Sequence, residues 1–128
     1  MFKKLGILIL AGLLVVMPVT AFSKVQSATF AWDQVITPGF AGWTLYMSTT
    51  QGGPYAVFSE IGYNPEVTEY TSTQSVTSPD GVKATYYFVM TARDTNGNVS
   101  AYSTEVMLTV DAIAPNVPQN LTVTIIIE

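Results

Sequence analysis

The segment "DTNGN" places the oxygen-bearing side chains of Asp94, Asn96 and Asn98 at alternate positions. Carboxylate and amide oxygens at this spacing begin the calcium-binding loops of proteins, so calcium binding is the first chemistry to consider here. An Asn-Gly pair between two strands is also a strong signal for a tight hairpin, and a hairpin explains the same residues without an ion. We therefore predict a structural turn and no metal site.

Two carboxylates, Glu66 and Glu69, come nearest to a general acid and base pair. The surrounding sequence predicts a strand, in which side chains three residues apart point to opposite faces, so the two groups do not converge. The chain has no His and no Cys, which excludes imidazole bases, thiolate sites and disulfides. We predict that the protein is not an enzyme and uses no cofactor.

The charge is mildly acidic, with five Lys and Arg against nine Asp and Glu and a formal net charge of -4. Two of the lysines, Lys3 and Lys4, lie in the leader described next, so the mature chain is more acidic still. Nucleic acid and anionic membrane surfaces are therefore not expected as partners.

Residues 1–23 have the layout of a secretory signal peptide. Two lysines precede an apolar run that ends at Pro18, and this run is shorter than the ~20 residues that span a bilayer. Small residues allow cleavage after Ala21 or after Ser23, and no Cys follows that could carry a lipid. The mature protein is expected to be secreted, in the periplasm or outside the cell, without stable membrane insertion.

From Ser27 onward, β-branched and aromatic residues alternate with polar ones, and clusters of Gly, Pro, Asn and Asp interrupt the pattern about every ten residues. This pattern predicts an all-β chain of short strands joined by turns. The clearest strands are "SATFAWD", "WTLYMST" and "ATYYFVMTARD", followed by "YAVFSEIG", "VTEYTST" and "SAYSTEVMLTV". Their inward faces provide the predicted core residues Phe30, Trp32, Trp43, Leu45, Tyr86 and Phe88.

These segments, above all "GVKATYYFVMTARDTNGNVSAYSTEV", resemble a fibronectin type III domain of the kind found in secreted bacterial and phage proteins. The resemblance implies an immunoglobulin-like sandwich of seven antiparallel strands with Greek-key connections, occupying residues 24–112. It assigns Trp32 to the second strand of the family, Trp43 to the third and Tyr86 to the tyrosine corner. The proline-rich first strand of the family is missing, because "SKVQS" before "ATFAWD" is too short and too polar for it.

We predict that residues 113–128 form a proline-containing linker and an extra strand, because "PNVPQNLTV" resembles the missing first strand. Leu121, Val123 and Ile125 share one face of this strand, and such an apolar edge needs a cover. Three outcomes are open. The strand completes its own sandwich, it is donated to the next molecule so that the protein self-associates through residues 115–128, or it stays unpaired.

Two surfaces are candidates for binding. The resemblance places the loops "QVITPGFAG" and "DTNGN" at one end of the sandwich, where Ile36, Phe40, Asn96 and Asn98 are the candidate binding residues, with Phe40 either exposed or packed under the rim. The second candidate is a polar and aromatic outward face, suited to a glycan or a protein strand and formed by Thr44, Tyr46, Ser48, Tyr87 and Thr91.

The sequence thus predicts a secreted, non-catalytic module that binds or spaces other components, a protein or a glycan, at a cell or virion surface. The alternative is a structural subunit that self-assembles by donating its C-terminal strand. A third reading is a carbohydrate-binding accessory module.

Overall fold

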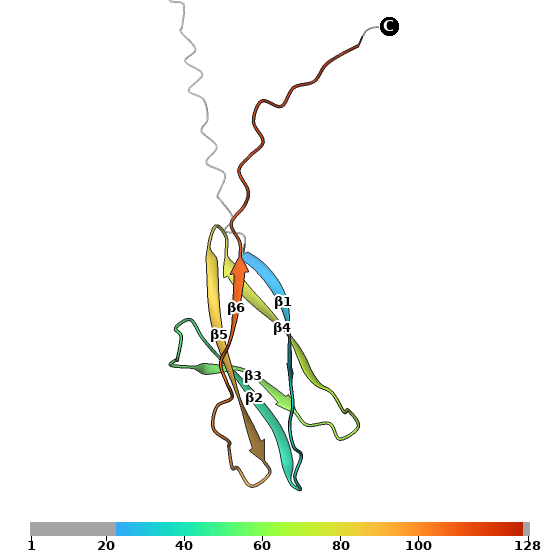
Figure 1. The fold of residues 1–128 in the computed structure, drawn as a ribbon, viewed down its shortest axis with the longest axis vertical. Coiled ribbons are helices and arrows are strands. Elements are labelled where there is room, and N and C mark those ends of the chain that lie inside the picture. Colours follow the sequence, from blue (N-terminus) through green and yellow to red (C-terminus); the bar gives the residue numbers. More distant parts are fainter. Residues whose placement is uncertain (1–22, 127–128) are drawn as a thin grey trace, which may run out of the picture.

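Residues 23–126 are described in a computed structural model of the protein. They form an all-β fold of two antiparallel sheets (Figure 1). The six strands are β1 (Ser23–Trp32), β2 (Phe40–Ser48), β3 (Ala56–Gly62), β4 (Tyr70–Pro79), β5 (Lys83–Asp94) and β6 (Val106–Asp111). The predicted leader lies almost wholly outside the described residues. The expectation of seven strands is wrong by one, because nothing in the described part of the chain forms the first strand of the family.

The first sheet has only two strands, β1 and β4, which pair over ten residues each. β1 begins at Ser23, so the polar stretch "SKVQS" extends this strand instead of forming a separate one. The hydroxyls of Thr29 and Thr73 meet across the pair at 2.9 Å. In a two-stranded sheet each strand is paired on one side, so the second edge of β1 has no ladder partner within residues 23–126.

The second sheet has the strand order β3-β2-β5-β6. The central strand β2 contains a bulge between Phe40 and Gly42, opposite β5. Gly42 has a φ of +153°, and a Cβ at this position would lie 2.3 Å from the carbonyl oxygen of Ile61 on β3. The neighbouring backbone therefore leaves room only for glycine.

The strand predicted over "SAYSTEVMLTV" is shorter than expected, because β6 begins only at Val106. Residues 99–105 run beside β5 but are attached to it by serine hydroxyls as well as by backbone groups. The amides of Met90 and Ala92 donate to the hydroxyls of Ser103 and Ser100 at 2.9 and 2.8 Å. These hydroxyls replace ladder carbonyls, which ends the regular strand early.

The core lies between the two sheets. Phe88 on β5 is fully buried, and the rings of Phe30 and Phe58 pack edge-on against it at centroid distances of 4.8 and 5.6 Å. Nearby, Trp43 is buried and Trp32 packs against it at 5.1 Å. Of the six predicted core residues, three are buried, namely Trp43, Leu45 and Phe88. The other three are partly buried, namely Phe30, Trp32 and Tyr86.

The two ends of the sandwich differ. β1 begins and β6 ends at the same pole, where the Lys24 ammonium group donates to the carbonyl oxygen of Asp111 at 2.8 Å. We call this the exit pole. The loop between β1 and β2 and the turn after β5 lie at the other end, which we call the loop pole (Figure 1).

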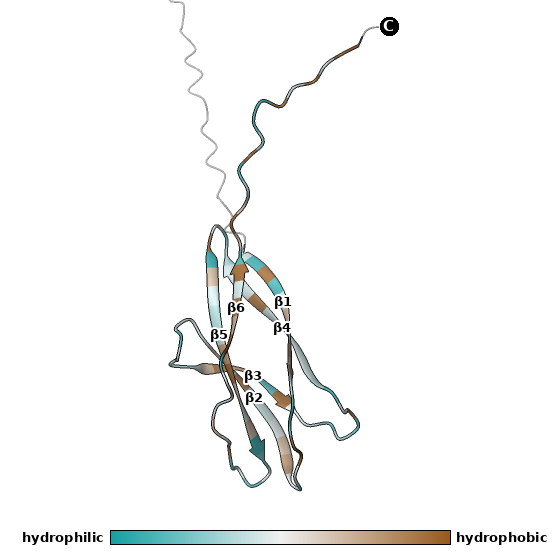
Figure 2. Ribbon diagram, in the orientation of Figure 1, coloured by the Kyte–Doolittle hydropathy of each residue, from teal (hydrophilic) through white to brown (hydrophobic). Residues whose placement is uncertain are grey.

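Beyond β6 the chain leaves the exit pole and continues away from the sandwich (Figure 1). Ala112 fixes this departure: its N–H donates to Val82 and its carbonyl accepts from Gly81, both at 3.0 Å. Residues 112–126 carry no assigned strand, and Figure 2 shows hydrophobic residues along them. The extra strand predicted within residues 113–128 thus makes no ladder with its own sandwich over the described residues.

Candidate functional site

The structure brings the two predicted binding loops together at the loop pole. The Thr95 amide donates to the carbonyl oxygen of Gly39 at 2.8 Å, and Phe40 lies opposite Asp94 in the register of β2 and β5. A shallow groove between the loops has Val35 on one side and Asn98 on the other. The loops therefore form one surface, held by backbone contacts.

The candidate residues on this surface differ in exposure. Phe40 is partly buried and packs its ring against Trp43 and Tyr63 at centroid distances of 5.0 and 5.4 Å. Of the two positions predicted for Phe40, exposed or packed under the rim of the sandwich, the structure shows the packed one. Ile36 is partly buried as well, whereas Asn96 and Asn98 are exposed.

The "DTNGN" segment is a turn capped by its own carboxylate. Asp94 accepts the backbone amides of Asn96 and Asn98 at 3.0 and 2.9 Å and the side-chain amide of Asn98 at 2.9 Å. These bonds, chiefly the one from the Asn98 side chain, hold the pKa of Asp94 below its ordinary value. Because Asn98 turns a nitrogen, and not an oxygen, toward the carboxylate, the turn is internally satisfied.

Glu105 stands twelfth counting Asp94 as first, where a calcium loop carries its last ligand. In the fold, however, its carboxylate accepts from the hydroxyl of Tyr55 and from the Gly52 amide. No cluster of three His, Cys, Asp or Glu able to hold a metal occurs within residues 23–126.

The outward face of β2 and β5 is less open than the sequence suggested. Thr44, Ser48 and Thr91 are buried. The guanidinium group of Arg93 lies over this face, donating to the carbonyl oxygen of Trp43 at 2.5 Å. The polar row is therefore covered in part by its own neighbours, because the outer face of a twisted sheet is overlain by long side chains.

Three tyrosines form a chain on this face, with Tyr102 in the middle. Its ring contacts those of Tyr46 and Tyr55, each at a centroid distance of 5.2 Å. Tyr46 belongs to β2, Tyr55 to the turn before β3, and Tyr102 to the connection between β5 and β6. Tyr102 keeps 53% of its surface exposed. We call these three residues together with Glu105 the tyrosine face.

Glu105 orders one end of the tyrosine face. The hydrogen bond that it accepts from the hydroxyl of Tyr55 is the main reason that the pKa of Tyr55 is raised to about 12. Tyr46 was predicted for the outward face from the sequence, whereas Tyr55 and Tyr102 were not. The only local signal was that both are aromatic residues in polar segments, "TQGGPY" and "NVSAYS".

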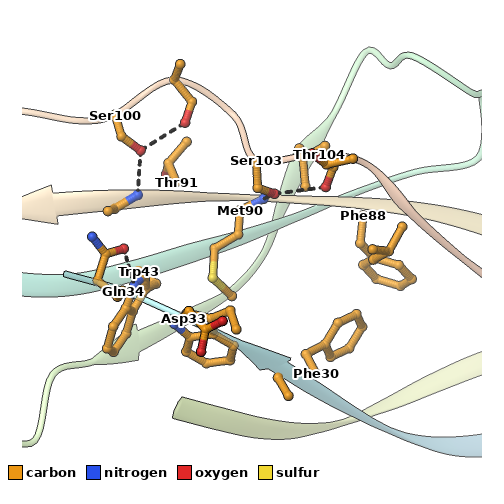
Figure 3. Close-up of a pocket in the computed structure, with 16 residues that line it drawn as sticks. Phe30, Asp33, Gln34, Trp43, Phe88, Met90, Thr91, Ser100, Ser103 and Thr104 are labelled. Carbon is orange, nitrogen blue, oxygen red and sulfur yellow. Dashed lines mark hydrogen bonds between the residues drawn. The ribbon is translucent and has the colours of Figure 1, made fainter. Parts of the chain in front are cut away.

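A second hollow feature runs along β1, and Figure 3 looks into it. Phe30 from β1 and Phe88 and Met90 from β5 project into this space, and the segment that carries Ser100 and Ser103 forms the far wall. It continues between residues 28–31 of β1 and residues 106–108 of β6, where no charged side chain lines it. We call the two parts together the β1 groove.

The described residues include no helix of the length and hydrophobicity that a membrane span requires.

No family model matches the chain, and no curated protein matches it. Among solved structures, the chain is similar to an Fn3-like protein from Clostridium thermocellum, with 30% sequence identity and a TM-score of 0.43. The match covers 63% of this chain and 73% of that one. The fold is Fn3-like, all-β with two antiparallel sheets.

Proposed function

We propose that this chain is a secreted, non-catalytic binding module that contacts a protein or a glycan at a cell or virion surface through the tyrosine face. A sandwich of this kind is a rigid scaffold, and its surface residues determine what it binds. Secretion rests on the signal-peptide layout of residues 1–23. Either cleavage position leaves β1 intact from Lys24 onward.

The observation that carries this proposal is the half-exposed ring of Tyr102 between two other tyrosines. Tyrosine combines a large apolar area with a hydroxyl group and loses little side-chain entropy on binding. Because Tyr46 and Tyr55 hold the ring of Tyr102 from both sides, the surface is ordered before a ligand arrives, which lowers the cost of association. Attachment of the connecting segment to β5 by Ser100 and Ser103 explains the ring contacts but not the exposure of Tyr102.

The test uses immobilised mature protein, residues 24–128, on a glycan array and against envelope and secreted fractions of the source culture. Tyr102→Ala is expected to weaken binding by about tenfold or more, as removal of an interface tyrosine does. The matched control is Val35→Ala, which removes a residue of 82% exposure at the loop pole. This control is expected to bind like the unmodified protein.

Other results would reassign the site. Loss of binding by Val35→Ala or Asn96→Ala, with full binding by Tyr102→Ala, would place the contact at the loop pole. Retention of glycans alone, lost in Tyr102→Ala, would support the carbohydrate-binding accessory reading. Equal binding by all variants would refute a role for either surface.

A further inference from the structure

We infer that the segment after β6 adds as a third strand to the two-stranded sheet of a second copy of this chain, where it pairs with the free edge of β1 and covers the β1 groove. The donated residues are 119–126, and the acceptor is the part of β1 nearest the loop pole. This inference goes beyond the proposed binding function and does not depend on it, because the tyrosine face lies on the other sheet.

The donor segment has the properties of an unpaired strand. Leu121, Val123 and Ile125 alternate with polar threonines, and these three side chains are 93, 87 and 80% exposed. Residues 112–126 contain no charged side chain. An exposed, uncharged and alternating segment is a template for pairing with another strand.

The acceptor offers both backbone and side-chain partners. The second edge of β1 has no ladder partner in the described chain, so half of its N–H and C=O groups are available for a further antiparallel strand. Beside this strand the β1 groove is lined by apolar residues of β6, among them Val106, which is 53% exposed. The buried Nε1 of Trp32, which lines the groove, has no hydrogen-bond partner among the described residues.

Donor and acceptor agree in length and polarity. Residues 121–126 span about 20 Å as a strand, and the groove follows residues 28–32 of β1, which span about 17 Å. With Leu121, Val123 and Ile125 turned inward, the apolar side chains enter a hollow whose β1–β6 part has no charged lining residue. The outward face of the added strand then carries Thr122, Thr124 and Ile126.

The same pairing within one molecule is opposed by geometry. An antiparallel strand on β1 must enter at Trp32, at the loop pole, about 30 Å from the end of β6. Residues 112–120 reach only about 30 to 33 Å when fully extended. No residues would then remain to reverse the direction of the chain at the loop pole. A tight turn of the chain directly after β6 is opposed for two reasons. Ala112 is hydrogen-bonded to the β4–β5 turn. The residues before Pro115 and Pro118 also favour extended conformations.

Pairing between two molecules needs no reversal. The segment already points away from the exit pole along the long axis (Figure 1), and an acceptor placed ahead of it presents its loop pole first. The strand then enters beside Trp32 and runs antiparallel to β1. Because donor and acceptor surfaces differ, the contact is heterologous, and repetition extends a linear assembly.

A complementation experiment tests this inference with full mature chains. Val123→Asp disables the donor by placing a charge on its inward face, and Thr124→Asp adds the same charge to the outward face as a matched control. Val106→Asp disables the acceptor at an exposed groove residue. Light scattering over a concentration series measures the mass of each chain alone, and circular dichroism confirms that each is folded.

The unmodified chain is expected to grow in mass with concentration, and Thr124→Asp to do the same. Val123→Asp and Val106→Asp are each expected to associate about tenfold or more weakly, since an unpaired charge is costly to bury. Their mixture is expected to stop at a one-to-one dimer, because the intact donor of one meets the intact acceptor of the other. An unmodified chain that is monomeric throughout, or a mixture without dimer, would overturn the inference.

Tryptophan fluorescence provides a second readout that does not depend on assembly size. Trp32 and Trp43 both line the β1 groove, so a peptide of residues 115–128 added to Val123→Asp is expected to change the emission and saturate. The same peptide carrying Val123→Asp is expected to have no effect. If deletion of residues 119–128 instead lowers the melting temperature of a monomer, the segment pairs within its own molecule and donation is refuted.

Discussion

The hydroxyl of Tyr86 on β5 donates a hydrogen bond of 2.6 Å to the carbonyl oxygen of Thr77 on β4, and thereby joins the two sheets. This is the bond that the resemblance to a tyrosine corner assigns to Tyr86. Tyr86→Phe keeps the ring and removes the bond, so we expect a loss of about 0.5–1.5 kcal/mol in the free energy of unfolding, measured with urea. Tyr87→Phe is the control, because that hydroxyl makes no hydrogen bond with any residue in the described range 23–126.

Gly42 and Gly62 face each other in the register of β2 and β3 and are expected to respond oppositely to the same substitution. Gly42→Ala would set a Cβ against the Ile61 carbonyl, so we expect a loss of at least about 1–3 kcal/mol or failure to fold. Gly62→Ala has no atom within 4 Å of the new Cβ and should leave the melting temperature nearly unchanged. Equal effects of the two changes would contradict this register of β2 and β3.

The Tyr55–Glu105 bond predicts a specific pH dependence. The pKa of Tyr55 is raised from 10.0 to about 12 in the folded protein, mainly by the hydrogen bond to Glu105. A raised pKa means that the stabilisation is fully present below about pH 10 and is lost as the pH rises from 10 toward 12. Ultraviolet titration of phenolate should show this late step, and Glu105→Gln should move it toward 10, whereas Glu60→Gln on β3 should not.

Phe88 is the centre of the core, and its truncation is expected to be strongly destabilising. Phe88→Ala removes the ring against which Phe30 and Phe58 pack, so we expect a loss of about 3–5 kcal/mol. In a domain without disulfides this is a large part of a typical total stability of about 5–15 kcal/mol. Val57→Ala, at a site with 61% exposure on β3, should change the stability by less than about 0.5 kcal/mol in the same urea experiment.

Period-two alternation is sufficient to predict the centre of this fold. Trp43, Leu45 and Phe88 are buried because they lie on the inward faces of β2 and β5, where the side chains of a regular strand alternate between the two faces. The partners of each strand are a different matter. β1 begins four residues before the predicted start, since pairing with a long β4 keeps even the polar residues from Ser23 onward in register.

The features that the sequence did not predict depend on contacts between distant segments. Tyr102 reaches Tyr46 and Tyr55 only because Ser100 and Ser103 fasten the connecting segment to β5 by their hydroxyls, and no local pattern encodes that choice. Glu105 likewise has its partners Tyr55 and Gly52 about fifty residues earlier in the chain. A single sequence predicts which residues form a strand more readily than where a loop comes to rest.

The common pole at which β1 begins and β6 ends also determines how the sandwich would respond to force. Tension applied between Ser23 and Asp111 acts at one end of β1 and of β6. It therefore breaks the hydrogen bonds of the β1–β4 and β5–β6 ladders one after another, starting at that end. Tension applied between opposite poles instead loads a whole antiparallel ladder in shear, with many bonds stretched together. A strand that enters beside Trp32 and a chain that leaves after Asp111 would transmit force in this second, mechanically stronger direction.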